Sequence, residues 1–214
     1  MTLKEDPTTV CAVLRENDAE LLSAVTSQER RADFNARISD RPSADADWIW
    51  LLDGTALPCP GALATLLAAA RRLEAAAPPI ILASIIVGRD GRLAPEHVAL
   101  ATQGRTAVAV QTASLRVLPI RAATGGSLLI RPQRFIERPR PGMAPVVTWT
   151  ARRLREGGGF LVPSSVARAR PAAHPRLEQA VLASRLALGP GRRVKERLRV
   201  VPEICERAIG FRAT

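Results

Sequence analysis

The segment between Asp47 and Leu67 constrains the fold of this chain more than any other part of the sequence. Its continuous apolar run, Trp48 to Leu52, ends at one carboxylate, Asp53, followed by the flexible residue Gly54. Such runs are typical of strands that are buried on both faces of a parallel sheet. Two prolines and an amphipathic stretch come next, so the segment predicts a strand, a turn and a helix.

Asp53 is the first candidate for a functional residue because it follows that strand directly. Open α/β sheets bind ligands at the carboxyl ends of their parallel strands. Two interpretations of Asp53 stay open: it contacts a ligand or a metal, or its side chain caps the turn. Thr55 has the same two alternatives, as a weak hydroxyl ligand or as a cap.

Apolar periodicity predicts further strands and helices along the chain. Expected strands are 8–14, 48–52, 80–87, 107–110, 115–120, 127–130 and 160–162. Expected helices are 18–25, 61–77, 131–137, 147–156, 175–188 and 192–209, while 28–46 and 92–106 are expected to be connector and loop. This alternation predicts an α/β fold with a mostly parallel sheet flanked by helices.

Length and composition place these elements in one main domain, 1–170, with a basic helical extension, 171–214. No apolar run approaches the roughly 18 residues that cross a bilayer, and the polar N-terminus lacks the order of a secretion signal. We therefore expect a cytoplasmic protein. Its three cysteines are widely separated, which favours reduced thiols.

Positive charge is concentrated in the C-terminal part of the chain. Residues 131–214 contain 18 Lys/Arg against 6 Asp/Glu, whereas residues 1–130 are close to neutral. A solvated basic surface, an anionic membrane surface and phosphate-rich ligands are the alternatives. Nucleic acid is disfavoured because stacking aromatics are scarce in the basic region. The apolar positions of 192–212 fit packing on the domain, a protein partner or a membrane lying against this helix.

Gly125, Gly126 and Ser127 form a second candidate site before an apolar strand. Glycines let the backbone approach a sugar or a phosphate closely, although a plain loop explains them equally well. Trp48 and Trp50 alternate along the expected strand, which favours core packing over a platform for a sugar.

The order of these segments resembles family 2 glycosyltransferases of the GT-A type, particularly actinobacterial members. The matching segments are Trp48–Asp53, Leu82–Val87 with Asp90 and Gly91, Leu118–Ala123, Gly126–Arg131, Trp149–Leu154 and Phe160–Val166.

This resemblance implies a protein that binds a nucleotide-sugar and moves the sugar onto a hydroxyl of a cell-envelope polysaccharide or glycolipid. A divalent metal, Mg²⁺ or Mn²⁺, would neutralise the diphosphate. Asp53 would hold the metal or the diphosphate, with Thr55 as a weak further ligand. Gly125, Gly126 and Ser127 would shape the acceptor side.

Several positions depart from the pattern of that family. Its Asp-x-Asp motif reads here as Asp53-Gly54-Thr55, and the segment expected to carry the general base, 144–148, contains no acid. Ala169 stands where the family often has a metal-binding histidine. The family's usual second strand, whose acidic end contacts the nucleotide base, has no convincing counterpart before Asp47. The alternative function is therefore a catalytically inactive relative that acts as a binding or scaffold subunit through its basic C-terminal helices.

Overall fold

The computed structural model of the chain describes residues 7–14, 18–28, 34–91, 94, 99–103, 106–110, 117–120, 122–123, 125–134, 149–150, 152–154 and 158–170. Its helices are α1 (Ala19–Thr26), α2 (Ala62–Glu74) and the short 3₁₀ helix η1 (Pro132–Arg134). Its strands are β1 (Thr8–Leu14), β2 (Phe34–Ser39), β3 (Trp48–Leu52), β4 (Ala56–Pro58), β5 (Pro79–Val87), β6 (Ala99–Gln103), β7 (Thr106–Val110), β8 (Leu118–Ile120), β9 (Ala122–Ala123), β10 (Leu128–Ile130) and β11 (Gly158–Ala169).

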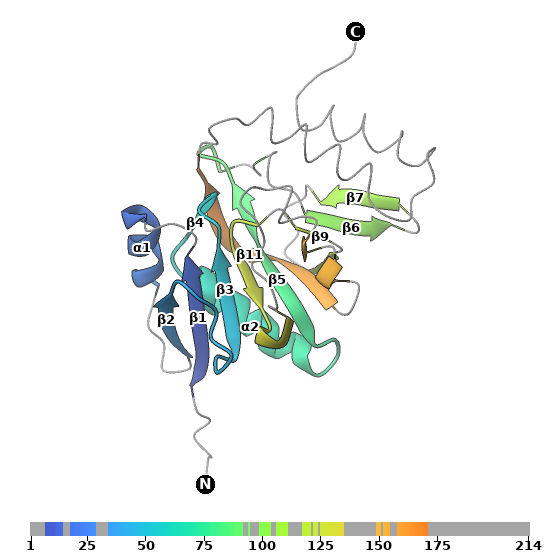
Figure 1. Cartoon of the computed structure of the whole chain (residues 1–214). Coiled ribbons are helices and arrows are strands. Elements are labelled where there is room, and N and C mark those ends of the chain that lie inside the picture. The colour runs from blue at the N-terminus through green and yellow to red at the C-terminus, as the bar shows by residue number, and fades with distance from the viewer. Residues whose placement is uncertain are drawn as a thin grey trace.

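A mixed sheet of eight strands forms the centre of the fold (Figure 1). Its order is β2-β1-β3-β10-β5-β11-β4, and β8 pairs with β11. Strands β1, β2, β3, β5 and β11 run in one direction, because β10 is antiparallel to both of its neighbours, β3 and β5. Strands β6, β7 and β9 form a smaller antiparallel sheet. The expected α/β fold with a largely parallel sheet is confirmed, with antiparallel strands inserted into it.

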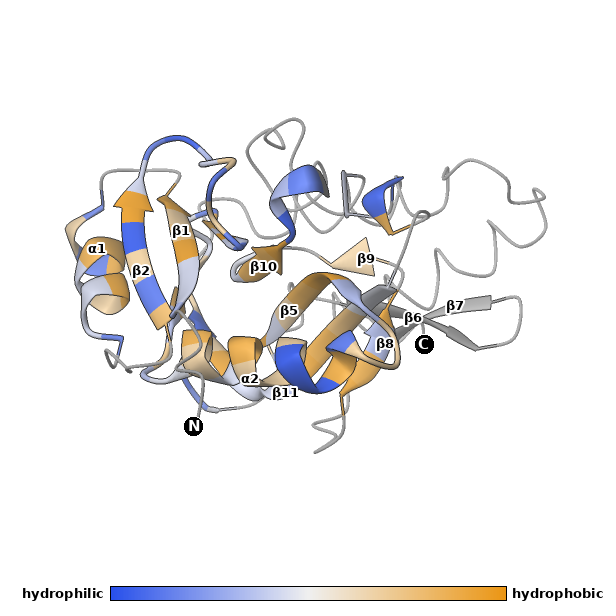
Figure 2. Cartoon of the chain, turned by 90° about the horizontal axis from the view of Figure 1, so that it is seen from below, coloured by the Kyte–Doolittle hydropathy of each residue, from blue (hydrophilic) through white to orange (hydrophobic). Residues whose placement is uncertain are grey.

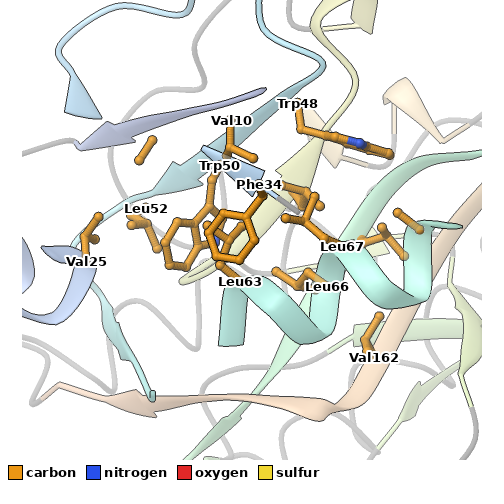
Figure 3. Close-up of a cluster of buried hydrophobic side chains, with 14 of the residues drawn as sticks. Val10, Val25, Phe34, Trp48, Trp50, Leu52, Leu63, Leu66, Leu67 and Val162 are labelled. Carbon is orange, nitrogen blue, oxygen red and sulfur yellow. The ribbon is translucent and has the colours of Figure 1, made fainter. Parts of the chain in front are cut away.

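Both faces of this sheet are buried, as the apolar run in β3 predicts. Alternate residues of β1 and β3 point to opposite faces. One face, with Trp50 and Leu52, packs against α1 and α2, and the other, with Ile49 and Leu51, packs against residues of β8 and of the segment 149–154. Figure 3 shows Trp50 gathered with Phe34 and Leu63 in the first of these cores.

Local sequence signals explain where α1 and α2 begin and end. Asp18 caps α1, because its Oδ1 accepts hydrogen bonds from the N–H groups of Glu20 (2.9 Å) and Leu21 (3.2 Å). α2 follows Gly61, whose φ of 77° is in the left-handed region. It buries one apolar stripe and ends before the prolines at 78 and 79.

The expected connector 28–46 is the main error of the sequence-based assignment, since it contains the edge strand β2. This strand pairs parallel with β1 and supplies the strand that seemed to be missing before Asp47. Four consecutive residues, 35–38, are exposed, and β2 lacks the continuous apolar run that marks a strand buried on both faces. Figure 2 shows the mixed hydropathy of β2, in contrast to the uniformly hydrophobic β10.

Smaller differences concern other elements. β6 lies in the expected loop 92–106, and β11 extends beyond 160–162 in both directions. Of the expected helix 131–137, the described residues 131–134 contain the 3₁₀ turn η1, and 135–137 lie outside the described residues. The register between β11 and β5 shifts between Val162 and Val166, around a proline that has no N–H to pair. The expected helices 175–188 and 192–209 lie outside the described residues. Within the described part of the chain, no helix is both long and apolar enough to cross a membrane.

Candidate functional site

The parallel strands bring several polar segments to one edge of the main sheet, which we call the carboxyl edge. It contains the N-terminus of α1, which follows β1, the turn 53–55, which follows β3, and Arg170, which follows β11. Hydrogen bonds join these three segments directly. The sequence separation between Asp18 and Arg170 shows that this site is assembled by the fold and not by one local motif.

Asp53 is 5% exposed and occupies the carboxyl end of β3. Its Oδ1 accepts hydrogen bonds from the backbone N–H of Thr55 (3.0 Å) and from the Thr55 hydroxyl (2.6 Å). Its Oδ2 is buried and accepts no hydrogen bond from the described residues. Asp53 therefore caps its own turn with one oxygen and leaves the other oxygen for a donor outside the described structure. An unpaired buried acceptor is costly, so this oxygen is the strongest indication of a ligand.

Arg170 fastens the end of β11 to the same turn. Its backbone N–H donates to the carbonyl oxygen of Thr55 at 2.9 Å, and its Nη1 donates to the carbonyl oxygen of Gly54 at 3.4 Å. Nη1 also donates to Asp18 Oδ2, and Nη2 lies 3.5 Å from Glu20 Oε2. The guanidinium thus lies between the turn after β3 and two carboxylates at the start of α1.

The pKa of Asp18 lies below its usual value. The principal cause is the hydrogen bond from Arg170, followed by the hydrogen bond from the Leu21 N–H, and both favour the carboxylate. A lowered pKa in the folded protein means that the unfolded chain binds the proton more readily. The contribution of this carboxylate to stability is therefore complete above its unfolded pKa and is lost as the pH falls through the folded pKa.

Acid is therefore expected to destabilise the protein partly through Asp18. As the pH falls below about 4, the free energy of unfolding should decrease more steeply in the original protein than in Asp18→Asn. Asparagine keeps the N-cap of α1 but has no charge to lose. Urea unfolding of both proteins over this pH range measures the difference. Equal pH dependence in the two proteins would contradict the assignment of this ion pair.

Ser127 is fully buried in a chain of hydrogen bonds that crosses the core. Trp50 Nε1 donates to Ser127 Oγ at 3.0 Å, Ser127 and Ser84 share a bond of 2.9 Å, and Ser84 and Ser165 share one of 2.7 Å. The Ser165 hydroxyl donates to the carbonyl oxygen of Ala62 at 3.0 Å. Since each hydroxyl has one hydrogen, Ser84 must donate to Ser165 and Ser127 to Ser84.

That network ties β3, β5, β11 and the residue before β10 to the start of α2, and it uses the only hydrogen of the Ser127 hydroxyl. The structure therefore gives Ser127 a packing role. Its expected contact with an acceptor stays a prediction.

Gly125 and Gly126 lie at the carboxyl edge, before β10, with φ values of 105° and 85°. A Cβ at Gly126 would lie 2.9 Å from Ile86 Cδ1 and 3.2 Å from Ala56 Cβ. Gly126 is therefore needed both for its left-handed backbone and for the close packing of β10 on its neighbours. Its approach to a ligand stays a prediction.

Gly126→Ala is expected to lower the free energy of unfolding by about 2–4 kcal/mol, from left-handed strain and from overpacking together. Gly91→Ala is a matched control, because Gly91 has a φ of 74° and nothing within 4 Å of an added Cβ. It should cost only the backbone strain, about 1–2 kcal/mol. Denaturant unfolding compares the two, and equal losses would show that the contacts at Gly126 do not matter.

The described residues do not fit the divalent metal that the resemblance implies. Mg²⁺ and similar hard cations need several oxygen ligands, some of them carboxylates. Asp53 offers one free oxygen, the hydrogen of the Thr55 hydroxyl points at Asp53, and the nearby carboxylates of Asp18 and Glu20 face Arg170. Across the described part of the chain, no three His, Cys, Asp or Glu side chains form a group that could hold a metal.

The structure thus brings some expected site residues together and adds others. Asp53 and Thr55 share one turn, and a Cβ at Gly126 would touch Ala56, so all three lie near one another at the carboxyl edge. The sequence predicted only that a helix begins at residue 18, and it assigned no site role to Asp18 or to Arg170. One signal in the sequence could have pointed to Arg170. It directly follows Ala169, and Ala169 stands at the position where the resemblance implies a metal-binding histidine.

Together, the sheet and its polar carboxyl edge define a GT-A-like α/β fold. The crystal structure of GalNAc-T7 with UDP, GalNAc and Mn²⁺ superposes with a TM-score of 0.51 and 11% sequence identity. The match covers 94% of this chain and 55% of that chain, so the present chain spans about half the length of this structural relative. At this identity the likeness concerns the fold.

Other comparisons add little to this result. The crystal structure of A197 from STIV aligns with a TM-score of 0.45 and 12% identity, over 77% of this chain and 86% of that chain. No protein-family model matches the sequence. No curated protein matches it either.

Proposed function

We propose that this chain is a glycosyltransferase-like protein that binds a nucleotide-sugar at the carboxyl edge and transfers the sugar to a hydroxyl. The buried, unpartnered Oδ2 of Asp53 carries this proposal. A hydroxyl of a ribose or a sugar supplies the hydrogen-bond donor that this oxygen lacks. The GT-A-like fold supports the same choice, since the related GalNAc-T7 structure contains UDP and GalNAc.

The family 2 assignment and a cell-envelope polysaccharide or glycolipid as acceptor form the finer part of this proposal. They rest on the order of the motifs from Trp48 to Val166. A cytoplasmic protein at the inner face of the membrane fits the same acceptors, with the basic segment 171–214 against anionic lipid or a protein partner.

Calorimetric titration of the purified chain with a set of nucleotide-sugars tests the proposal. Saturable binding of at least one of them, which competes with the matching nucleoside diphosphate, is the expected result. Absence of binding across the set, with and without Mn²⁺, would contradict it.

A second candidate function is the non-catalytic relative, and the ion pairs of Arg170 favour it. Transfer to a hydroxyl needs a carboxylate or another base within hydrogen-bond reach of the acceptor. Of the carboxylates described at this edge, Asp18 and Glu20 are engaged with Arg170, and the segment 144–148 contains no acid. Release of nucleoside diphosphate in the presence of membrane lipid acceptors would favour the enzyme. Tight binding without any turnover would favour the non-catalytic relative.

A further inference from the structure

Among the described residues, the carboxyl edge contains a cation, Arg170, hydrogen-bonded to the turn 53–55, and no group of metal donors. Two hydrogen bonds, from the Arg170 N–H to Thr55 and from its Nη1 to Gly54, hold the guanidinium against the turn that contains Asp53. Arg170 is half-buried, with a side-chain exposure of 28%, and can still be reached from solvent. Because Arg170 is paired with Asp18 and Glu20, these two carboxylates are not free to join Asp53 as ligands of a divalent cation.

Arginine is chemically suited to the task that a metal performs for a sugar diphosphate. Its guanidinium is charged at all physiological pH values and presents a planar fork of donors that matches phosphate oxygens. Contacts between guanidinium and phosphate are among the strong, charge-assisted hydrogen bonds. A fixed arginine can therefore neutralise a diphosphate without any ion from solution.

We infer that this chain binds its nucleotide-sugar without a divalent metal, and that Arg170 supplies the positive charge that faces the diphosphate. This inference rests on the proposed function, and it names the side chain that neutralises the diphosphate at the carboxyl edge. Arg170 is assigned as a ligand-binding residue, while Asp53 offers its free oxygen to a hydroxyl of the same ligand.

Asp18 and Glu20 have a defined part in this arrangement. They keep the guanidinium ordered beside the turn, but their negative charges oppose an anionic ligand and compete for the same N–H donors. Removing one of these charges should therefore strengthen the binding of a diphosphate. A purely structural Arg170 predicts no such gain, because a broken ion pair would loosen the site.

Calorimetry with a nucleotide-sugar, in the presence of EDTA and then of Mn²⁺, tests the role of the metal. We expect the same dissociation constant, within about twofold, in both solutions. Binding that requires Mn²⁺ would overturn the inference and leave the proposed function intact. Binding in neither solution would remove the proposed function, and the inference with it.

Substitutions at Arg170 test the guanidinium itself. Arg170→Gln should weaken binding at least about tenfold, and Arg170→Lys should recover part of the loss because it restores the charge. Arg168→Gln is the matched control, since Arg168 is an exposed arginine two residues before Arg170, and its binding should stay within about twofold. Equal binding by Arg170→Gln and the original protein would overturn the inference.

Asp18→Asn separates a ligand-binding arginine from a structural one. Asparagine preserves the N-cap of α1, so the helix remains while the competing charge is lost. We expect binding to tighten about twofold to tenfold, with less gain at high salt because the effect is electrostatic. If Asp18→Asn weakens binding as Arg170→Gln does, the ion pair is structural and the inference is wrong.

Discussion

Asp53→Asn is expected to weaken nucleotide-sugar binding by about tenfold to a hundredfold, the scale of a hydrogen bond to a charged group. The substitution keeps Oδ1 for the two hydrogen bonds from Thr55. It replaces the unpartnered Oδ2 by an amide N–H₂, which cannot accept a hydrogen from a ligand hydroxyl. Calorimetric titration measures the change.

The same substitution should leave the stability of the protein unchanged or raise it. Asp53 buries a charge whose Oδ2 has no partner among the described residues, and neutralising such a charge removes a desolvation cost. Lost binding with a preserved melting temperature is the mark of a residue kept for function. Unchanged binding would show that Asp53 is a turn cap alone.

Asp47→Asn provides the matched control for Asp53. Asp47 precedes β3 at the opposite edge of the sheet, where its Oδ2 accepts hydrogen bonds from the N–H and the hydroxyl of Thr9, at 2.7 and 2.8 Å. Its substitution should lower stability slightly and leave nucleotide-sugar binding unchanged. A loss of binding equal to that of Asp53→Asn would indicate a general effect on the sheet.

Trp50→Ala is expected to lower the free energy of unfolding by about 3–5 kcal/mol, as large aromatic truncations in cores do. The Trp50 side chain is fully buried between β3 and α2. Its removal leaves a cavity, and it also takes away the N–H that begins the chain of hydrogen bonds through Ser127. Unfolding by urea, followed by circular dichroism, measures the loss.

Trp50→Phe distinguishes these two contributions. Phenylalanine retains much of the apolar volume and loses the indole N–H, so its cost should be clearly smaller, about 1–3 kcal/mol. Ser127→Ala should then cost less in the Trp50→Phe protein than in the original protein, because the bond between Trp50 and Ser127 is already absent and only the bond between Ser127 and Ser84 is lost. A loss below about 1 kcal/mol in Trp50→Ala would contradict the described core.

Elements with a strong local signal could be predicted from the sequence. The strand 48–52 is apolar without interruption because both of its faces are buried, and burial on both faces favours an apolar side chain at every position. Helix α2 has its apolar stripe, glycine start and proline stop in one stretch. Asp53 could be predicted as a site residue for the same reason, since it ends the clearest strand.

Elements whose stability comes from distant partners could not be predicted in this way. Strand β2 is exposed on most of its length, and pairing with β1 gives it its conformation. The antiparallel direction of β10 has no local signal, because a short apolar strand buried between two others has the same composition in either direction.

By itself, the sequence determined the α/β class, the buried strand before Asp53 and the helix after it, because burial and periodicity are local properties of the chain. Only the tertiary structure decided what surrounds that carboxylate. Arg170 reaches Asp18 and Gly54 because parallel strands end at one edge of the sheet. Ser127, expected near a ligand, is buried because Trp50 and Ser84 hydrogen-bond to its hydroxyl from the neighbouring strands β3 and β5. Contacts across many residues depend on how the strands are ordered, and no local pattern specifies that order.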